Sequence, residues 1–157
     1  MYPVKDTDLA YLAGLIDGEG MIAIEKVRPA PHVKNGNPRY FMKVDIQMSA
    51  RPPIEHIARL FDRNIMIKKI TGNMRKQAYR LSWQAKIAAD LLTQILPYLV
   101  LKHPQALVAL EFQTALTAEG RGGNRRVPKT AEQIAMRERC YLEVRRLKHE
   151  TPGGLGC

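Results

Sequence analysis

Near its N-terminus the chain reads LAGLIDGEG, from Leu12 to Gly20. The residues from Leu9 to Ile16 are almost all apolar, and residues 6–8 before them are side chains that cap helices well. We therefore expect a helix here. An ordinary core helix explains its apolar residues. It does not explain Asp17 and Glu19, which follow at once beside glycines, because carboxylates are costly to bury unless they are neutralised.

Working outward from this stretch, the next segments predict two hairpins and four more helices. The clearest pattern runs from Arg39 to Met48, where polar and apolar residues alternate as in a strand with one wet and one buried face. Two hairpins give a small antiparallel sheet whose one face the helices must cover. Strands are expected at 21–27, 39–48, 65–70 and 77–83, and the later helices at 52–61, 86–96, 102–117 and 130–148. The sheet's other face, with Arg39, Lys43, Lys69 and Arg80, is left to a charged partner.

The composition narrows the class of protein. The 157 residues carry 25 Lys and Arg against 15 Asp and Glu, a net charge of +10 that points to a polyanion such as nucleic acid. Cys140 and Cys157 allow no disulfide framework, and the four histidines are too scattered for a zinc site. No apolar run approaches the ~20 residues of a membrane span, so we expect a soluble, intracellular protein that binds no membrane. We find no internal repeat, and expect one domain over 1–150 and a flexible tail at 151–157.

The segment from Leu12 to Gly20 resembles the LAGLIDADG signature of homing endonucleases. It matches that signature at seven of nine positions, with Gly18 in place of alanine and Glu19 keeping an acid at the second aspartate. The similarity extends over about residues 8 to 149 and is closest to the single-motif, homodimeric type. It implies an α+β fold: a mixed αββαββα LAGLIDADG core, with an antiparallel DNA-binding β-sheet saddle and additional C-terminal helices.

The resemblance also implies a function. The protein would be a site-specific endonuclease of a mobile intron or similar element, making a double-strand break in a long, nearly palindromic DNA target. Paired carboxylates repel each other unless a divalent cation lies between them, which suits metal-dependent phosphodiester hydrolysis. We expect Mg²⁺, with Mn²⁺ able to substitute. An RNA maturase or a non-cleaving DNA-binding regulator with the same fold is the alternative, and Glu19 and Lys102 favour cleavage.

Each expected role falls on particular residues. Glu19 and the Gly18 carbonyl would hold the metal, and Asp17 would cap or brace the turn rather than bind metal. Lys102 matches the family's active-site lysine, although from its position alone it would be a solvated residue at a helix start. Arg51 would orient water or phosphate, and Gln47 would do the same or contact DNA.

Two surfaces are expected to bind macromolecules. A twisted sheet can lie in the major groove of double-stranded DNA, where base edges are distinguishable. The residues expected to contact DNA are Glu25, Arg39, Lys43, Asp45, Gln47, Lys69, Arg75, Lys76 and Arg80. A homodimer would form where small residues let two helices approach closely, through Leu12, Ala13, Gly14 and Ile16.

Overall fold

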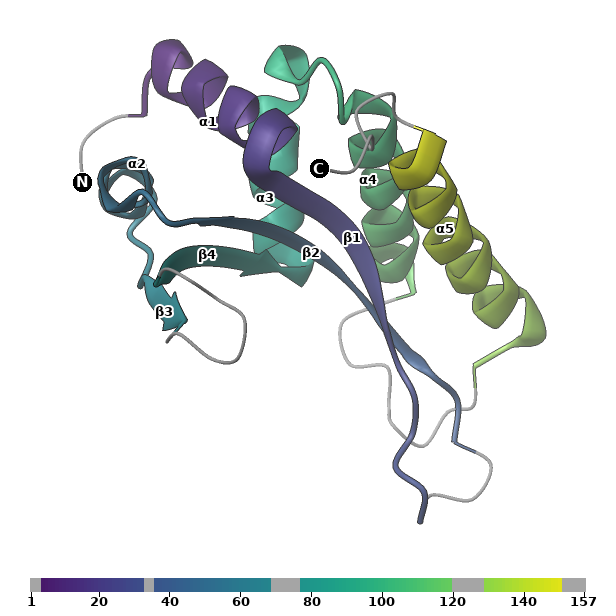
Figure 1. Ribbon diagram of the computed structural model, residues 1–157. Coiled ribbons are helices and arrows are strands. Elements are labelled where there is room, and N and C mark those ends of the chain that lie inside the picture. The colour runs from purple at the N-terminus through teal and green to yellow at the C-terminus, as the bar shows by residue number, and fades with distance from the viewer. Residues whose placement is uncertain (1–3, 33–35, 69–76, 120–128, 151–157) are drawn as a thin grey trace.

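A computed structural model of the chain describes residues 4–32, 36–68, 77–119 and 129–150 (Figure 1). The helices and hairpins follow one another in the order expected, and three α-helices come after the second hairpin. The elements are α1 (Asp6–Glu19), β1 (Gly20–Val27), β2 (Arg39–Met48), α2 (Arg51–Leu60), β3 (Met66–Lys68), β4 (Ala78–Gln84), α3 (Ala85–Ile95), the short 3-10 helix η1 (Leu96–Tyr98), α4 (His103–Ala118) and α5 (Ala131–Glu150).

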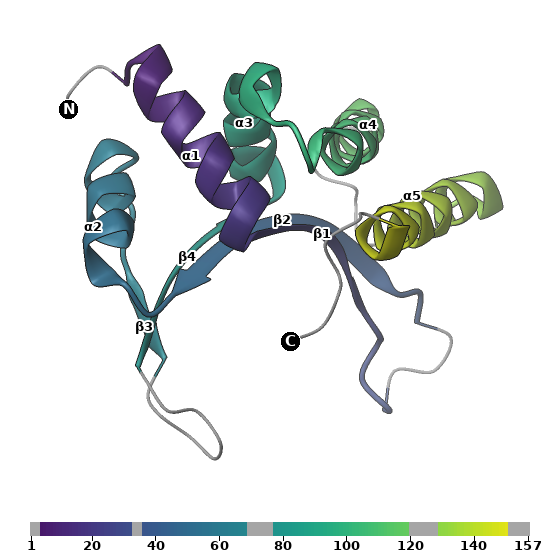
Figure 2. The ribbon, with the colours of Figure 1, turned by 45° about the horizontal axis from the view of Figure 1, so that its top comes forward.

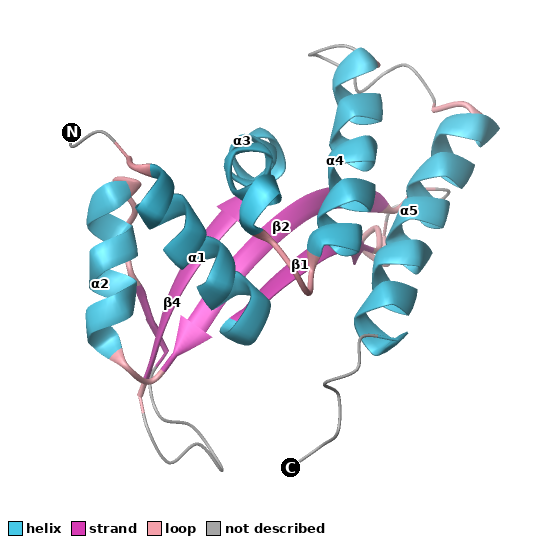
Figure 3. Ribbon diagram, turned by 90° about the horizontal axis from the view of Figure 1, so that it is seen from above, coloured by secondary structure: helices cyan, strands magenta, loops and turns pink. Residues whose placement is uncertain are grey.

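The four strands form one antiparallel sheet in the order β1-β2-β4-β3. The sheet is curved, and α1, α3, α4 and α5 lie on one side of it (Figure 2). Seen from above, the helices lie in a row across the sheet, in the order α2, α1, α3, α4, α5 (Figure 3). One face of the sheet is therefore covered by helices, and none of the described helices covers the other face, which we call the open face.

Alternation along the strands decides which residues enter the core. The apolar residues of one parity face the helices, and Met42, Val44, Ile46 and Leu81 have no solvent exposure at all. The helices contribute Leu12 and others to the same cluster. Burial of this apolar surface stabilises the fold, and it fixes the residues of opposite parity on the open face.

The prediction of an α+β fold with a four-stranded antiparallel sheet is confirmed, and the strand expected at 39–48 has those bounds. Helix α1 is longer than the expected 9–16. Residues 6–8 lie inside its first turn, where acidic side chains interact favourably with the positive end of the helix dipole. The Lys5 backbone N–H donates to Asp8 Oδ2 at 3.1 Å. In the described residues, no helix combines the length and apolarity needed to cross a bilayer. Residues 151–157, expected to form the tail, lie outside the described part of the chain.

Candidate functional site

The junction between α1 and β1 contains no linker. Glu19 ends the helix, and Gly20 begins the strand. The backbone N–H of Gly20 donates to the carbonyl of Ile16. A Cβ at Gly20 would lie 2.6 Å from the Ile16 Cα and 2.9 Å from its carbonyl oxygen, so the close approach requires glycine. This tight junction presents the exposed Glu19 side chain at the edge of the sheet.

Asp17 ties the end of α1 to the segment that precedes α4. Its carboxylate accepts backbone N–H bonds from Val100 at 2.8 Å, Leu101 at 3.1 Å and Lys102 at 2.8 Å. Asp17 was expected to cap or brace the turn, and the structure instead has it brace the helix end against this distant segment. The brace acts across the fold, because the three donors follow Asp17 by more than eighty residues. With both oxygens engaged, Asp17 is a structural carboxylate.

Lys102 lies against the same helix end. Its ammonium donates to the carbonyl of Ile16 at 2.8 Å and to the carbonyl of Asp17. Burial lowers the pKa of Lys102, and the negative charges of Asp17 and Glu19 partly oppose that shift. Lys102 is therefore a part-buried lysine close to Glu19, and the reading of it as a solvated residue at a helix start is wrong.

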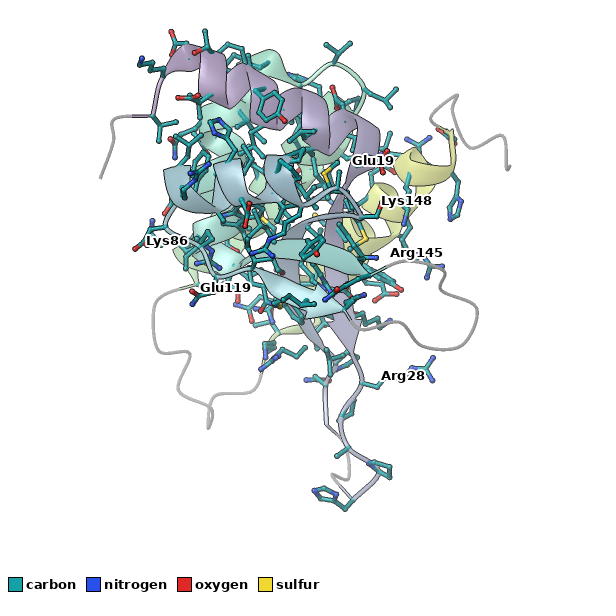
Figure 4. All side chains as sticks on the ribbon, turned by 60° about the vertical axis from the view of Figure 1, so that its left-hand side comes forward. Glu19, Arg28, Lys86, Glu119, Arg145 and Lys148 are labelled. Carbon is teal, nitrogen blue, oxygen red and sulfur yellow. The ribbon has the colours of Figure 1, made fainter. Side chains whose placement is uncertain are left out.

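The sequence analysis missed a second lysine near this site. Lys148, in the last turn of α5, is close enough to Lys102 that its charge also lowers the Lys102 pKa. Figure 4 shows Glu19 and Lys148 on the same side of the molecule, although they come from opposite ends of the chain. The sequence shows only a basic helix end, and tertiary packing alone brings that end to the α1–β1 junction.

Gln47 and Arg51 lie on different elements and make different contacts. Gln47 is exposed on the open face of β2 and directly follows Ile46, the partner of Gly20 in the sheet, so it lies beside the junction. Arg51 begins α2, where its Nε donates to Glu55 at 2.7 Å and its guanidinium lies 5.7 Å from the centre of the Tyr79 ring. These contacts hold Arg51 between α2 and β4.

The donors available for a metal are oxygen atoms from few residues. No cluster of three His, Cys, Asp or Glu side chains occurs within the described ranges. Since Asp17 is engaged, the junction offers the Glu19 carboxylate and the Gly18 carbonyl. Mg²⁺ sites commonly use one or two carboxylates and take their other ligands from water and substrate phosphate, so this donor set fits Mg²⁺ as part of a larger site.

The open face of the sheet carries most of the residues expected to bind DNA. Glu25, Arg39, Lys43, Gln47 and Arg80 all lie on it by strand parity. Lys43 lies 3.7 Å from Glu25 and 3.1 Å from Asp45, and Arg80 also pairs with Asp45. Lys69, Arg75 and Lys76 lie outside the described residues.

Asp45 departs from its expected role on this face. It was expected to contact bases, but it is only 6% exposed because Lys43 and Arg80 cover it. Its carboxylate therefore faces its neighbours.

The four residues expected at a dimer interface differ in their burial. Leu12, Ala13 and Ile16 are completely buried within the chain, because this stripe of α1 packs on the chain's own core. That part of the expectation needs correction, since a partner cannot reach buried side chains. Gly14 is exposed, and a Cβ built there meets no atom within 4 Å.

The fold is that of the LAGLIDADG homing endonucleases, so the resemblance found in the sequence is confirmed at the level of the fold. The structure matches I-CvuI, solved in complex with its target, with a TM-score of 0.63 and 17% identity over 96% of this chain and 86% of that one. It matches the archaeal intron-encoded I-Vdi141I, complexed with DNA, with a TM-score of 0.54 and 17% identity over 87% of this chain and 98% of that one.

A third similar structure is a longer chain. I-GzeII, in complex with its DNA target, gives a TM-score of 0.59 and 15% identity over 94% of this chain but only 46% of its own. Neither the scan against protein-family models nor the search of curated proteins finds a match.

Proposed function

We propose that this protein is a site-specific DNA endonuclease of the LAGLIDADG homing type. The observation that carries the proposal is the arrangement at the α1–β1 junction. There the exposed Glu19 lies close to the part-buried Lys102, next to a sheet face that bears Arg39, Lys43 and Arg80. A duplex lying along this face would bring a phosphate within reach of both side chains.

The residues of the junction divide the chemistry among them. Glu19 and the Gly18 carbonyl would hold Mg²⁺, with Mn²⁺ able to substitute, and the cation would neutralise charge that develops at the scissile phosphate. Lys102 is held by two main-chain carbonyls and presents a positive charge at a fixed place. Because its pKa is lowered, Lys102 gives up a proton more readily than an exposed lysine does. Gln47 would orient the attacking water.

Arg51 and Lys148 would assist from the periphery. Arg51 would hold phosphate from the start of α2, after releasing Glu55. Lys148 would add a second positive charge beside Lys102.

Cleavage of both strands calls for two copies of this site. The described chain offers one free carboxylate at one junction, so we propose a homodimer related by a two-fold axis and a nearly palindromic target. The exposed face of α1 would form the contact, centred on Gly14, where the lack of a side chain permits close packing of two helices. This chain covers 46% of I-GzeII, so that longer protein has room for a second unit of this size.

A library of randomised duplexes incubated with Mg²⁺ tests the proposed activity. The unaltered protein should cleave a subset of sequences, and Glu19→Gln should bind that subset but not cleave it, because the metal-binding charge is lost. Glu132→Gln, which alters an exposed acid at the far end of α5, is the control and should cleave normally. Substantial cleavage by Glu19→Gln would disprove the metal-binding role. Selective binding without cleavage by the unaltered protein would indicate a regulator.

The dimer has its own test. Gly14→Leu should leave the subunit folded, since the space around Gly14 is open, but should hold two subunits apart. Sedimentation should then show dissociation, with loss of double-strand cleavage. If the unaltered protein makes double-strand breaks while bound to its DNA as a single 17.8 kDa subunit, the homodimer is wrong.

A further inference from the structure

Asp45 occupies the middle of the open face. It lies on β2, where its neighbours across the sheet are Met21 on β1 and Ser82 on β4. By strand parity it belongs to the face that the helices leave open, yet its side chain is only 8% exposed. A carboxylate that is withdrawn from solvent on an open face needs an explanation, because burying a charge is costly unless it is paired.

The explanation lies in the cations around it. Lys43 Nζ is 3.1 Å from Asp45 Oδ2, and an Arg80 guanidinium nitrogen donates to the same oxygen. The Lys43 and Arg80 side chains are themselves only 15% and 20% exposed. Such pairing is stronger than at a fully solvated surface, since water screens these charges less. One carboxylate oxygen thus fixes two cationic side chains.

This arrangement does not serve stability alone. The other oxygen, Oδ1, is buried, as is the Ser82 hydroxyl, and neither has a hydrogen-bond partner within the part of the chain that is described. Buried acceptors without partners are unfavourable, and a buried ion pair is often no more stable than an apolar replacement. A negative charge also opposes the approach of a polyanion. Both costs fall on a surface that we propose binds DNA.

We propose that Asp45 is a positioning residue for sequence recognition. It fixes the Arg80 guanidinium and the Lys43 ammonium in the orientation in which they meet base edges, and it does not itself touch DNA. The inference rests on the proposed function, because it requires that the open face bind DNA. The buried Asp45 carboxylate is then needed for discrimination between DNA sequences but not for overall affinity.

Helix α3 supplies a control. Asp90 carries the same charge, but its side chain is 58% exposed and pairs with Lys86 one helical turn away, outside the open face. Asp45→Ala and Asp90→Ala each remove one negative charge from the protein. A role limited to net charge therefore leaves discrimination between sequences unchanged in both variants, whereas a positioning role predicts a loss of discrimination in Asp45→Ala alone.

The measurement compares two duplexes for each protein. One is a sequence selected by the unaltered protein from a randomised library, and the other is a scrambled duplex of equal length and composition. Asp90→Ala should keep the affinity ratio of the two duplexes, with equal or slightly tighter binding to both. Asp45→Ala should keep or gain affinity for the scrambled duplex and lose discrimination on the order of tenfold, the effect of one lost base contact. An unchanged ratio would overturn the inference.

A second comparison guards against a folding defect. In a background that combines Lys43→Ala with Arg80→Ala, Asp45→Ala should cause little further loss of discrimination, because both side chains that it positions are gone. A full and additive second loss would overturn the inference. If the unaltered protein selects no sequence, both the proposed function and this inference fail. If it selects one but both acidic variants behave alike, only the inference fails.

Discussion

Removing the Asp17 carboxylate should destabilise the protein considerably. Asp17→Ala leaves three backbone N–H groups, those of residues 100–102, without their acceptor. A hydrogen bond to a charged group contributes about 1.5–3 kcal/mol. Since water can reach the exposed Val100 and Leu101 and replace the lost acceptor, the total falls below the sum for three such bonds, at about 2–4 kcal/mol. For a domain of this length that corresponds to a fall in Tm of roughly 5–15 °C.

Thermal unfolding followed by circular dichroism measures this effect directly. Glu19→Ala is the control, because it removes an exposed carboxylate two residues away from the same helix end. It should change Tm by no more than about 2 °C, as surface substitutions usually do. If Asp17→Ala and Glu19→Ala unfold at the same temperature, the bridge between α1 and the segment before α4 contributes nothing and our reasoning is wrong.

Three further predictions concern the same framework. Gly20→Ala should cost about 1–3 kcal/mol in chemical denaturation, because the new Cβ meets the Ile16 backbone, whereas Gly14→Ala should not destabilise the subunit; equal losses would contradict this. Burial lowers the pKa of Lys102, so the folded state binds its proton less tightly than the unfolded chain does. The stability of the protein relative to Lys102→Met should therefore rise with pH between that lowered pKa and the ordinary value of 10.5, and a flat difference in urea titrations would refute it. Hydrogen bonds from Lys26 lower the pKa of Glu138. The unaltered protein should therefore be more stable than Glu138→Gln at neutral pH, and this difference should vanish as the pH falls through the lowered pKa of Glu138. A difference that persists in acid would show that the Lys26–Glu138 ion pair is not its source.

Local periodicity explains why the sheet could be predicted from the sequence. From Arg39 to Met48 the alternation fixes both the strand and its buried side, since a strand points successive side chains to opposite faces. The expected positions of Lys43 and Arg80 on the open face follow from the same rule, and the structure agrees with them. The junction motif was equally visible, because two acids among glycines have no ordinary role in a core helix.

The remaining features depend on contacts between distant segments. Helix α1 is apolar on more than one side, so the sequence alone could not show that Leu12, Ala13 and Ile16 face the chain's own core while Gly14 faces outward. The burial of Asp45 requires cations from two strands, and strand parity cannot reveal this. Lys148 reaches the junction only because α5 packs along β1, which the Lys26–Glu138 ion pair between them supports.

Because β1 begins directly after the last residue of α1, the helix and the strand are coupled rigidly. No residue separates the two elements, and the hydrogen bond from the Gly20 N–H to the Ile16 carbonyl restricts rotation of the strand relative to the helix. Any twist imposed on the sheet must therefore displace the Glu19 side chain, and any tilt of the helix must be felt along the strand. The curvature of the open face and the position of the Glu19 carboxylate are therefore linked. A substitution on β1 that changes one of them also changes the other.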